Sequence, residues 1–69
     1  MKKMLQDYLQ ETMFTLAVDR EEQMINKYET YEELLKNEEI KKLLKEYKKI
    51  SEEHIKILNK KMSQLNISQ

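Results

Sequence analysis

The chain has 69 residues, and its thirteen basic and thirteen acidic side chains give a formal net charge of zero. This balance argues against nucleic acid or an anionic membrane surface as a partner, because both require a strong positive field. No apolar run is long enough to span a membrane, and Asp7 and Glu11 interrupt the only stretch that could act as a signal peptide. We therefore expect a cytoplasmic protein.

Residues 1–69 can hold one small domain, and a lone core of this size rarely gives more than roughly 3 to 5 kcal/mol of stability. Cysteine is absent, so neither a disulfide nor a thiolate metal site can add to it. Oligomerisation, or a metal held by nitrogen and oxygen ligands, is the expected source of further stability.

The first predicted element is a long helix over residues 4–35. Glycine and proline are absent, and good helix formers dominate the composition, so we expect an all-α fold. Spacings of three and four residues place one stripe on a single helix face. The stripe consists of Met13, Ala17, Glu21, Met24, Tyr28, Tyr31 and Leu35.

An alternative layout divides this helix. Asp19 and Glu22 fit a helix-start pattern, so a break near Val18 would give a three-helix bundle. We favour the continuous helix, because the stripe keeps its phase through Glu21 and no loop-forming residues surround the break.

Residues 36–37 are the predicted bend, followed by a second helix over residues 38–66. Asn37 tolerates the left-handed conformation that ends a helix, and Glu38 and Glu39 suit the first turn of the next one. We expect residues 1–3 and 66–69 to fray. The second stripe consists of Ile40, Leu44, Tyr47, Ser51, His54, Leu58, Met62 and Leu65.

The two helices are expected to form an antiparallel hairpin. Residues 1–36 contain five basic and eight acidic residues and residues 37–69 the reverse, so the two halves attract each other. Apolar residues also lie beside each main stripe, which suits helices with more than one neighbour. These are Phe14, Val18 and Ile25, and then Leu43, Ile50 and Ile57. The pattern predicts that two hairpins pair as a homodimeric four-helix bundle.

Glu21 and His54 are the candidate functional residues, because each interrupts an otherwise apolar stripe. A bend at residues 36–37 brings them to one level, as it does Tyr28 and Tyr47, and we expect the first pair to share a dry layer. A carboxylate and an imidazole in a core must be paired, neutralised or bound to a ligand. They form either a hydrogen-bonded pair or, through two copies, a site for zinc, iron or manganese.

The segments EEQMINKY, from Glu21 to Tyr28, and LLKEYKKISEEH, ending at His54, resemble the half-bundle of ferritin-like proteins of the rubrerythrin or spore-coat-F type. The resemblance implies a helix that supplies a Glu and a Tyr, Glu21 and Tyr28, facing a helix that supplies Glu-x-x-His. His54 matches the histidine, but Ser51 stands where the second carboxylate belongs. Tyr28, Tyr47 and Ser51 are expected to surround any metal.

Three functions stay open. The favoured one is a non-enzymatic structural or interaction protein, a ferritin-like hairpin that forms a homodimer. The second is a metal-binding dimer that uses Glu21 and His54, and the third is a regulator that presents one face to a protein partner. The sequence shows no nucleophile with an adjacent base, and no third residue that would complete a catalytic group with Ser51 and His54. We therefore do not expect an enzyme.

Overall fold

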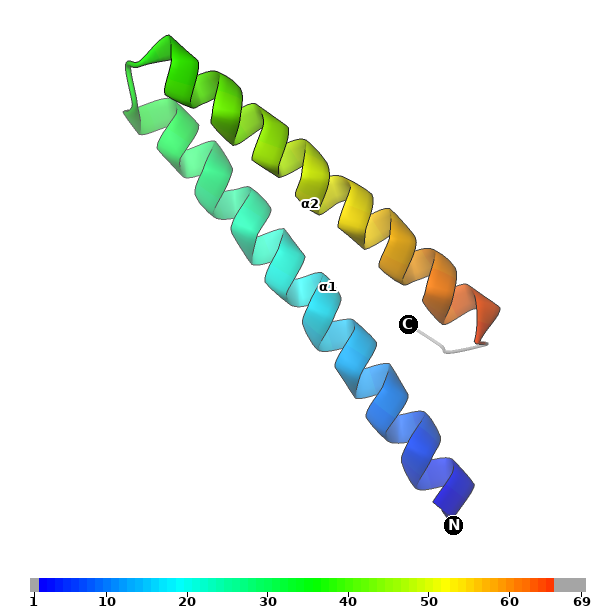
Figure 1. Ribbon diagram of the computed structural model, residues 1–69. Helices are drawn as coiled ribbons and strands as arrows, with labels where there is room; N and C mark the ends of the chain where they lie inside the picture. Colours follow the sequence, from blue (N-terminus) through cyan, green and yellow to red (C-terminus); the bar gives the residue numbers. More distant parts are fainter. Residues whose placement is uncertain (1, 66–69) are drawn as a thin grey trace.

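The computed structural model describes residues 2–65, and these form two α-helices and no strand (Figure 1). Helix α1 spans Lys2–Leu34, with 33 residues, and helix α2 spans Glu38–Gln64, with 27 residues. The helices run antiparallel along each other, so the predicted all-α hairpin is confirmed. Neither helix has the length and apolar content that a membrane span requires, within the described part of the chain.

Helix α1 passes through Val18 and Asp19 without a break, so the chain does not adopt the three-helix alternative. The helix begins at Lys2 and ends at Leu34, where the sequence predicted residues 4–35. Lys2 and Lys3, predicted to fray, therefore belong to the helix. The predicted end of the second helix at residue 66, and the predicted fraying of Met1 and residues 66–69, lie outside the described residues.

The connection consists of residues 35–37, and in it Asn37 has a role that differs from the prediction. Its backbone is extended, with φ −73° and ψ 115°, so the left-handed conformation predicted for it is wrong. The Asn37 side-chain oxygen accepts hydrogen bonds from the backbone N–H groups of Glu39, at 3.0 Å, and Ile40, at 3.2 Å. The first N–H groups of a helix have no acceptor within it, and Asn37 supplies one as the N-cap of α2.

The contact face of α2 coincides only in part with the predicted stripe, of which Leu44, Ser51, Leu58 and Met62 are covered. Ile40, Tyr47 and Leu65 are exposed, whereas Lys41 and Lys48, which lie outside that stripe, are partly covered. Long lysine stems can cover apolar surface while the charged ends reach water, and apolarity by residue type misses this. The covered positions of α2 are Lys41, Leu44, Lys48, Ser51, Ile55, Leu58, Asn59 and Met62.

The facing side of α1 includes the apolar residues Phe14, Val18 and Ile25, which the sequence had placed beside the main stripe. All three are partly covered, whereas Met13, Tyr31 and Leu35 of the predicted stripe are exposed. Ala17, Glu21, Met24 and Tyr28 of the predicted stripe are partly covered as well, so the contact face of α1 is the middle of that stripe together with its flank.

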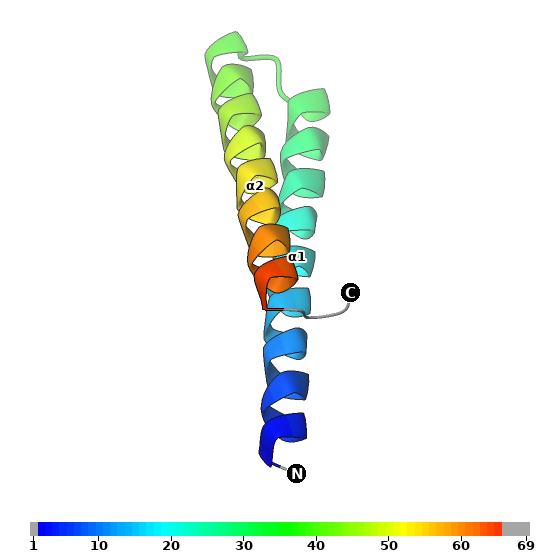
Figure 2. The ribbon, with the colours of Figure 1, turned by 90° about the vertical axis from the view of Figure 1, so that its right-hand side faces the viewer.

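The hairpin is a thin rod with almost no interior. It measures 54 × 17 × 13 Å, and among the described residues only Leu44, Ser51 and Met62 are buried. Figures 1 and 2 show that α1 continues past the end of α2. The pairing of Glu21 with His54 places Gln64 level with about residue 11, so the overhang is about nine residues, or roughly 13 Å, long.

Candidate functional site at Glu21 and His54

The structure brings together the two polar residues that the sequence singled out. His54 Nδ1 lies 3.1 Å from Glu21 Oε1, across the gap between the helices. Glu21 comes from the middle of α1 and His54 from the second half of α2. This contact and the one between Tyr28 and Tyr47 confirm the predicted register of the hairpin.

Tyr28 and Tyr47 form the next level toward the bend. Their ring centroids lie 5.9 Å apart with the ring planes tilted by 46°, a geometry that favours contact between the edge of one ring and the face of the other. Ser51 lies between this level and the Glu21–His54 pair and is 5% exposed. Its small side chain allows the two helices to approach closely at this point.

Two open hollows flank the pair on one side of the hairpin. The larger has a volume of about 380 Å³ and is lined by Ala17, Arg20, Glu21, His54, Ile57 and Leu58. The other, of about 260 Å³, includes Tyr47 and Ile50 together with Glu21 and His54. The pair therefore lies on the floor of a mostly apolar groove.

The dry layer was predicted for two paired hairpins, and one hairpin alone does not form it. The His54 side chain is 52% exposed and that of Glu21 is 24% exposed. Two helices cover only one side of each other, so a group between them stays open to water unless further elements close over it. The pair is half-buried in one chain, with its open side in the groove.

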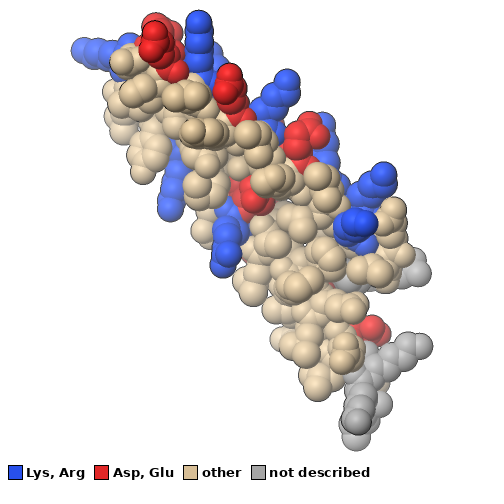
Figure 3. All heavy atoms as spheres, viewed as in Figure 1, with Lys and Arg blue, Asp and Glu red and all other residues tan. Residues whose placement is uncertain are grey.

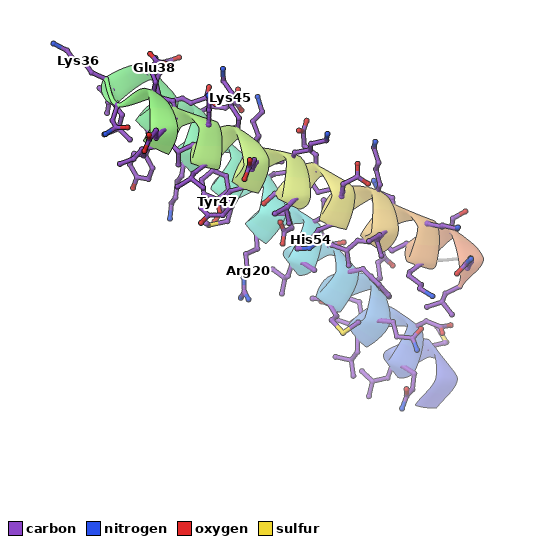
Figure 4. All side chains as sticks on the ribbon, turned by 45° about the horizontal axis from the view of Figure 1, so that its top comes forward. Arg20, Lys36, Glu38, Lys45, Tyr47 and His54 are labelled. Carbon is purple, nitrogen blue, oxygen red and sulfur yellow. The ribbon has the colours of Figure 1, made fainter. Side chains whose placement is uncertain are left out.

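Arg20 lies next to this pair on the same side of the hairpin, and it lines the larger hollow. In Figure 4, Arg20 and Tyr47 project from one edge of the hairpin, while Lys45 and Glu38 project from the opposite edge. Within residues 2–65 Arg20 makes no ion pair. The groove thus has an unpaired positive charge close to a carboxylate.

One hairpin by itself does not supply the ligands of a di-metal centre. The described part of the chain has no group of three or more His, Cys, Asp or Glu that could hold a metal ion. Ser51 provides no carboxylate, and Glu53 forms an exposed ion pair with Lys56 at 3.6 Å. Each hairpin would therefore contribute one bridging carboxylate where the ferritin-like centre uses two.

A single metal ion would have few ligands available. Glu21 already contacts Nδ1 of His54, which leaves Nε2 as the free ring nitrogen. In this geometry the carboxylate orients the ring, as residues behind a metal ligand do. One hairpin presents one ring nitrogen and the second oxygen of Glu21, so only two copies together would reach the four donors typical of a structural zinc site.

The same geometry does not join Ser51 and His54 as a nucleophile and its base. No hydrogen bond joins Ser51 to His54 in residues 2–65, and the neighbour of the imidazole is Glu21. A nucleophile would need that contact to lose its proton.

Sequence reasoning divided the residues of the groove between the main stripe of α2 and its flank. Ile40, Leu43, Tyr47, Ile50, His54 and Ile57 recur at spacings of three and four, so they form a second stripe on α2. The predicted stripe mixed members of this row with residues that face α1. The regular spacing was available in the sequence, but it does not reveal which row meets the other helix.

Comparisons with protein-family models, curated proteins and solved structures give no match. A function for the chain must therefore follow from its own residues.

Proposed function

We propose that this chain is a non-enzymatic, self-associating structural protein, in which two hairpins close their grooves on each other as a four-helix bundle. The observation that supports it is the apolar surface that one hairpin leaves uncovered. Figure 3 shows most charged side chains along the outer edge of α2, while the face over α1 is formed mainly by uncharged residues.

The uncovered area is large for a chain of this size. The hairpin has 6095 Å² of accessible surface, whereas a compact monomer of 8.5 kDa has about 4,700 Å². The excess of about 1,400 Å² exceeds the roughly 800 Å² that each partner contributes to a standard interface. Association would supply the interior that one hairpin lacks.

The exposed residues have the arrangement that a bundle requires. On α2, Leu43, Ile50 and Ile57 lie about 100° around the helix from the residues that face α1. On α1, Met13, Leu16 and Tyr31 occupy the corresponding flank. In a four-helix bundle each helix contacts two neighbours through two such adjacent faces.

The ferritin-like resemblance gives this proposal a more specific form. A hairpin that keeps Glu21, Tyr28 and His54 but has Ser51 in place of a carboxylate would keep the bundle and lose the di-metal chemistry. The Glu21–His54 pair would then be a polar contact inside the bundle.

Sedimentation equilibrium of the purified chain tests self-association, and we expect a dimer at micromolar concentration. Ile50→Lys and Ile57→Lys place a charge in the groove and should give a monomer. The matched control, Lys45→Glu, changes a charge on the opposite edge and should leave the dimer intact. A wild-type monomer would contradict the proposal and would favour the alternative of a regulator whose groove receives a partner protein.

A further inference from the structure

The two rims of the groove have charges of opposite sign. On α1, Arg20 lines the larger hollow, and Lys27, seven residues or about two turns further on, lies on the same side of the helix. On α2, Glu46 and Glu53 lie four residues before and three residues after Ile50, so both border the exposed apolar row of that helix. All four charged residues are exposed. Arg20 and Lys27 thus form a basic α1 rim, and Glu46 and Glu53 an acidic α2 rim.

The opposite side of the hairpin has the reverse distribution of charge. There α1 provides the acid and α2 the base, and Glu29 pairs with Lys48 inside one chain at 3.6 Å. On the groove side the two rims are separated by the groove itself. Within residues 2–65 neither Lys27 nor Glu46 makes an ion pair. These two charges are therefore available to a second molecule.

Two hairpins can close their grooves on each other with two-fold symmetry in two ways. If the axis runs along the rod, both bends lie at the same end, and each α1 packs against α2 of the other copy. If the axis runs across the rod, the bends lie at opposite ends, each α1 packs against the other α1, and each α2 against the other α2. The first arrangement brings basic rims to acidic rims, whereas the second brings rims of like charge together.

The levels of the rim residues also match in the first arrangement. In one hairpin, residues of α1 and α2 whose numbers sum to 75 lie level, as in the contacts between residues 21 and 54 and between residues 28 and 47. Rotation about an axis along the rod does not move a residue along it, so the same rule holds between the copies. Lys27 then lies within two residues, or about 3 Å, of the level of Glu46 in the second copy, and Arg20 lies equally close to the level of Glu53. Long side chains on adjacent helices span such an offset.

We infer that the second copy binds with both bends at the same end, so that each α1 packs against α2 of the other copy. Lys27 then pairs with the other copy's Glu46, and Arg20 with its Glu53. Ion pairs beside an apolar seam set the orientation of partner helices, and like-charge contacts exclude the wrong orientation. This inference rests on the proposed self-association and adds its symmetry.

Charge reversal tests the inference. Lys27→Glu places an acid opposite Glu46 of the other copy, and Glu46→Lys places a base opposite Lys27. Attractive contacts at both rims become repulsive, so each variant should dimerise roughly tenfold more weakly than wild type in sedimentation equilibrium. No charged residue lies three or four positions from Lys27, so its reversal disturbs no pair within α1. Lys45→Glu, on the opposite edge, is the control and should dimerise like wild type.

A mixture of the two variants gives a readout that a folding defect would not produce. In their heterodimer the two reversed side chains meet each other and the two unreversed ones meet each other, so both pairs are attractive again. One variant is labelled with nitrogen-15, the mixture is unfolded and refolded together, and the dimers are quantified by native mass spectrometry. We expect about nine-tenths heterodimer, against half for random pairing. Labelled Lys45→Glu mixed with wild type should give the random value.

An axis across the rod predicts the opposite sign for one variant. Lys27→Glu would then bring an acid to the basic rim of the other α1 and strengthen the dimer. A Lys27→Glu dimer at least as tight as wild type, or random pairing in the mixture of variants, would overturn the inferred symmetry and leave self-association standing. A monomeric wild-type chain would overturn both.

Discussion

At the scale of single residues, Glu21 and His54 define the polar level of the groove. Their contact is half-exposed in one hairpin, where a hydrogen bond contributes little beyond what water provides. If a second copy covers the groove, the same contact becomes desolvated, and losing one partner leaves the other buried without a hydrogen bond. The pair should therefore affect association more strongly than the stability of the isolated hairpin.

His54→Ala should weaken the dimer. At about 1 kcal/mol for each of two pairs, the dissociation constant should rise roughly 30-fold, which sedimentation at several concentrations can measure. Lys60→Ala, on an exposed position of the same helix, is the control and should leave the constant unchanged. Equal dissociation constants for His54→Ala and wild type would show that the pair lies outside the interface.

Substitution of Ser51 tests whether the chain can bind a metal ion at Glu21 and His54. Wild-type protein purified without chelator should show no stoichiometric zinc, iron or manganese by elemental analysis, because Glu21 contacts Nδ1 of His54 and no second carboxylate faces them. Ser51→Glu restores the Glu-x-x-His spacing at a buried position, so it should lower the melting temperature in the presence of chelator and recover it on adding zinc. Ser51→Ala is the matched control. One metal ion per wild-type dimer, lost in His54→Ala, would establish the metal-binding alternative instead.

At the scale of elements, the bend depends on one side chain. Without glycine or proline the chain reverses over residues 35–37, and Asn37 satisfies two backbone N–H groups at the start of α2. Glu38 and Glu39 in that first turn add a favourable interaction with the helix dipole. The reversal is thus specified by helix capping.

Asn37→Ala should lower the free energy of unfolding by about 1 kcal/mol, since the two N–H groups lose their acceptor. Asn37→Asp keeps a capping oxygen and should cost much less, and Lys36→Ala, at the neighbouring exposed position, should have little effect. Urea denaturation monitored by circular dichroism gives all three values. A large loss in Lys36→Ala together with none in Asn37→Ala would contradict the capping role.

Helix α1 is continuous from Lys2 to Leu34. The helix-start pattern at Asp19 and Glu22 does not interrupt α1, because the backbone groups there already have hydrogen-bond partners in the preceding turn. A break would leave those groups unpaired without burying more apolar surface. The unbroken helix is also what produces the overhang beyond α2.

At the scale of the whole molecule, a rod with three buried residues among those described has little to hold it together alone. The charge difference between the two helices and contacts such as Lys48 with Glu29, at 3.6 Å, favour the hairpin register, but partly exposed ion pairs contribute little stability. Folding and self-association should therefore be coupled.

Coupling makes stability depend on concentration. A tenfold increase in protein should stabilise a folded dimer by about 1.4 kcal/mol relative to unfolded chains, which raises the melting temperature by several degrees. Calorimetry from about 5 to 500 μM measures the shift. Ile50→Lys should melt lower and at a temperature that no longer depends on concentration. A wild-type melting temperature that stays constant over this range would exclude coupled folding.

The sequence by itself determined the helices, the site of the reversal and the level at which Glu21 meets His54. Helix propensity and the absence of glycine and proline act locally, and so does the interruption of the pattern at residues 36–37. The antiparallel register then follows from the position of the bend. Tyr28 and Tyr47 meet for the same reason.

Only the tertiary structure decided which side of each helix faces the other. Each helix has two apolar rows next to each other. In α2 the row that faces α1 also includes Lys41 and Lys48, which residue type alone marks as polar although their aliphatic stems can cover apolar surface. In this arrangement Ile50 and Ile57 are exposed and His54 is half-exposed. Burial depends on what packs beside a residue, and spacing along one chain does not contain that information.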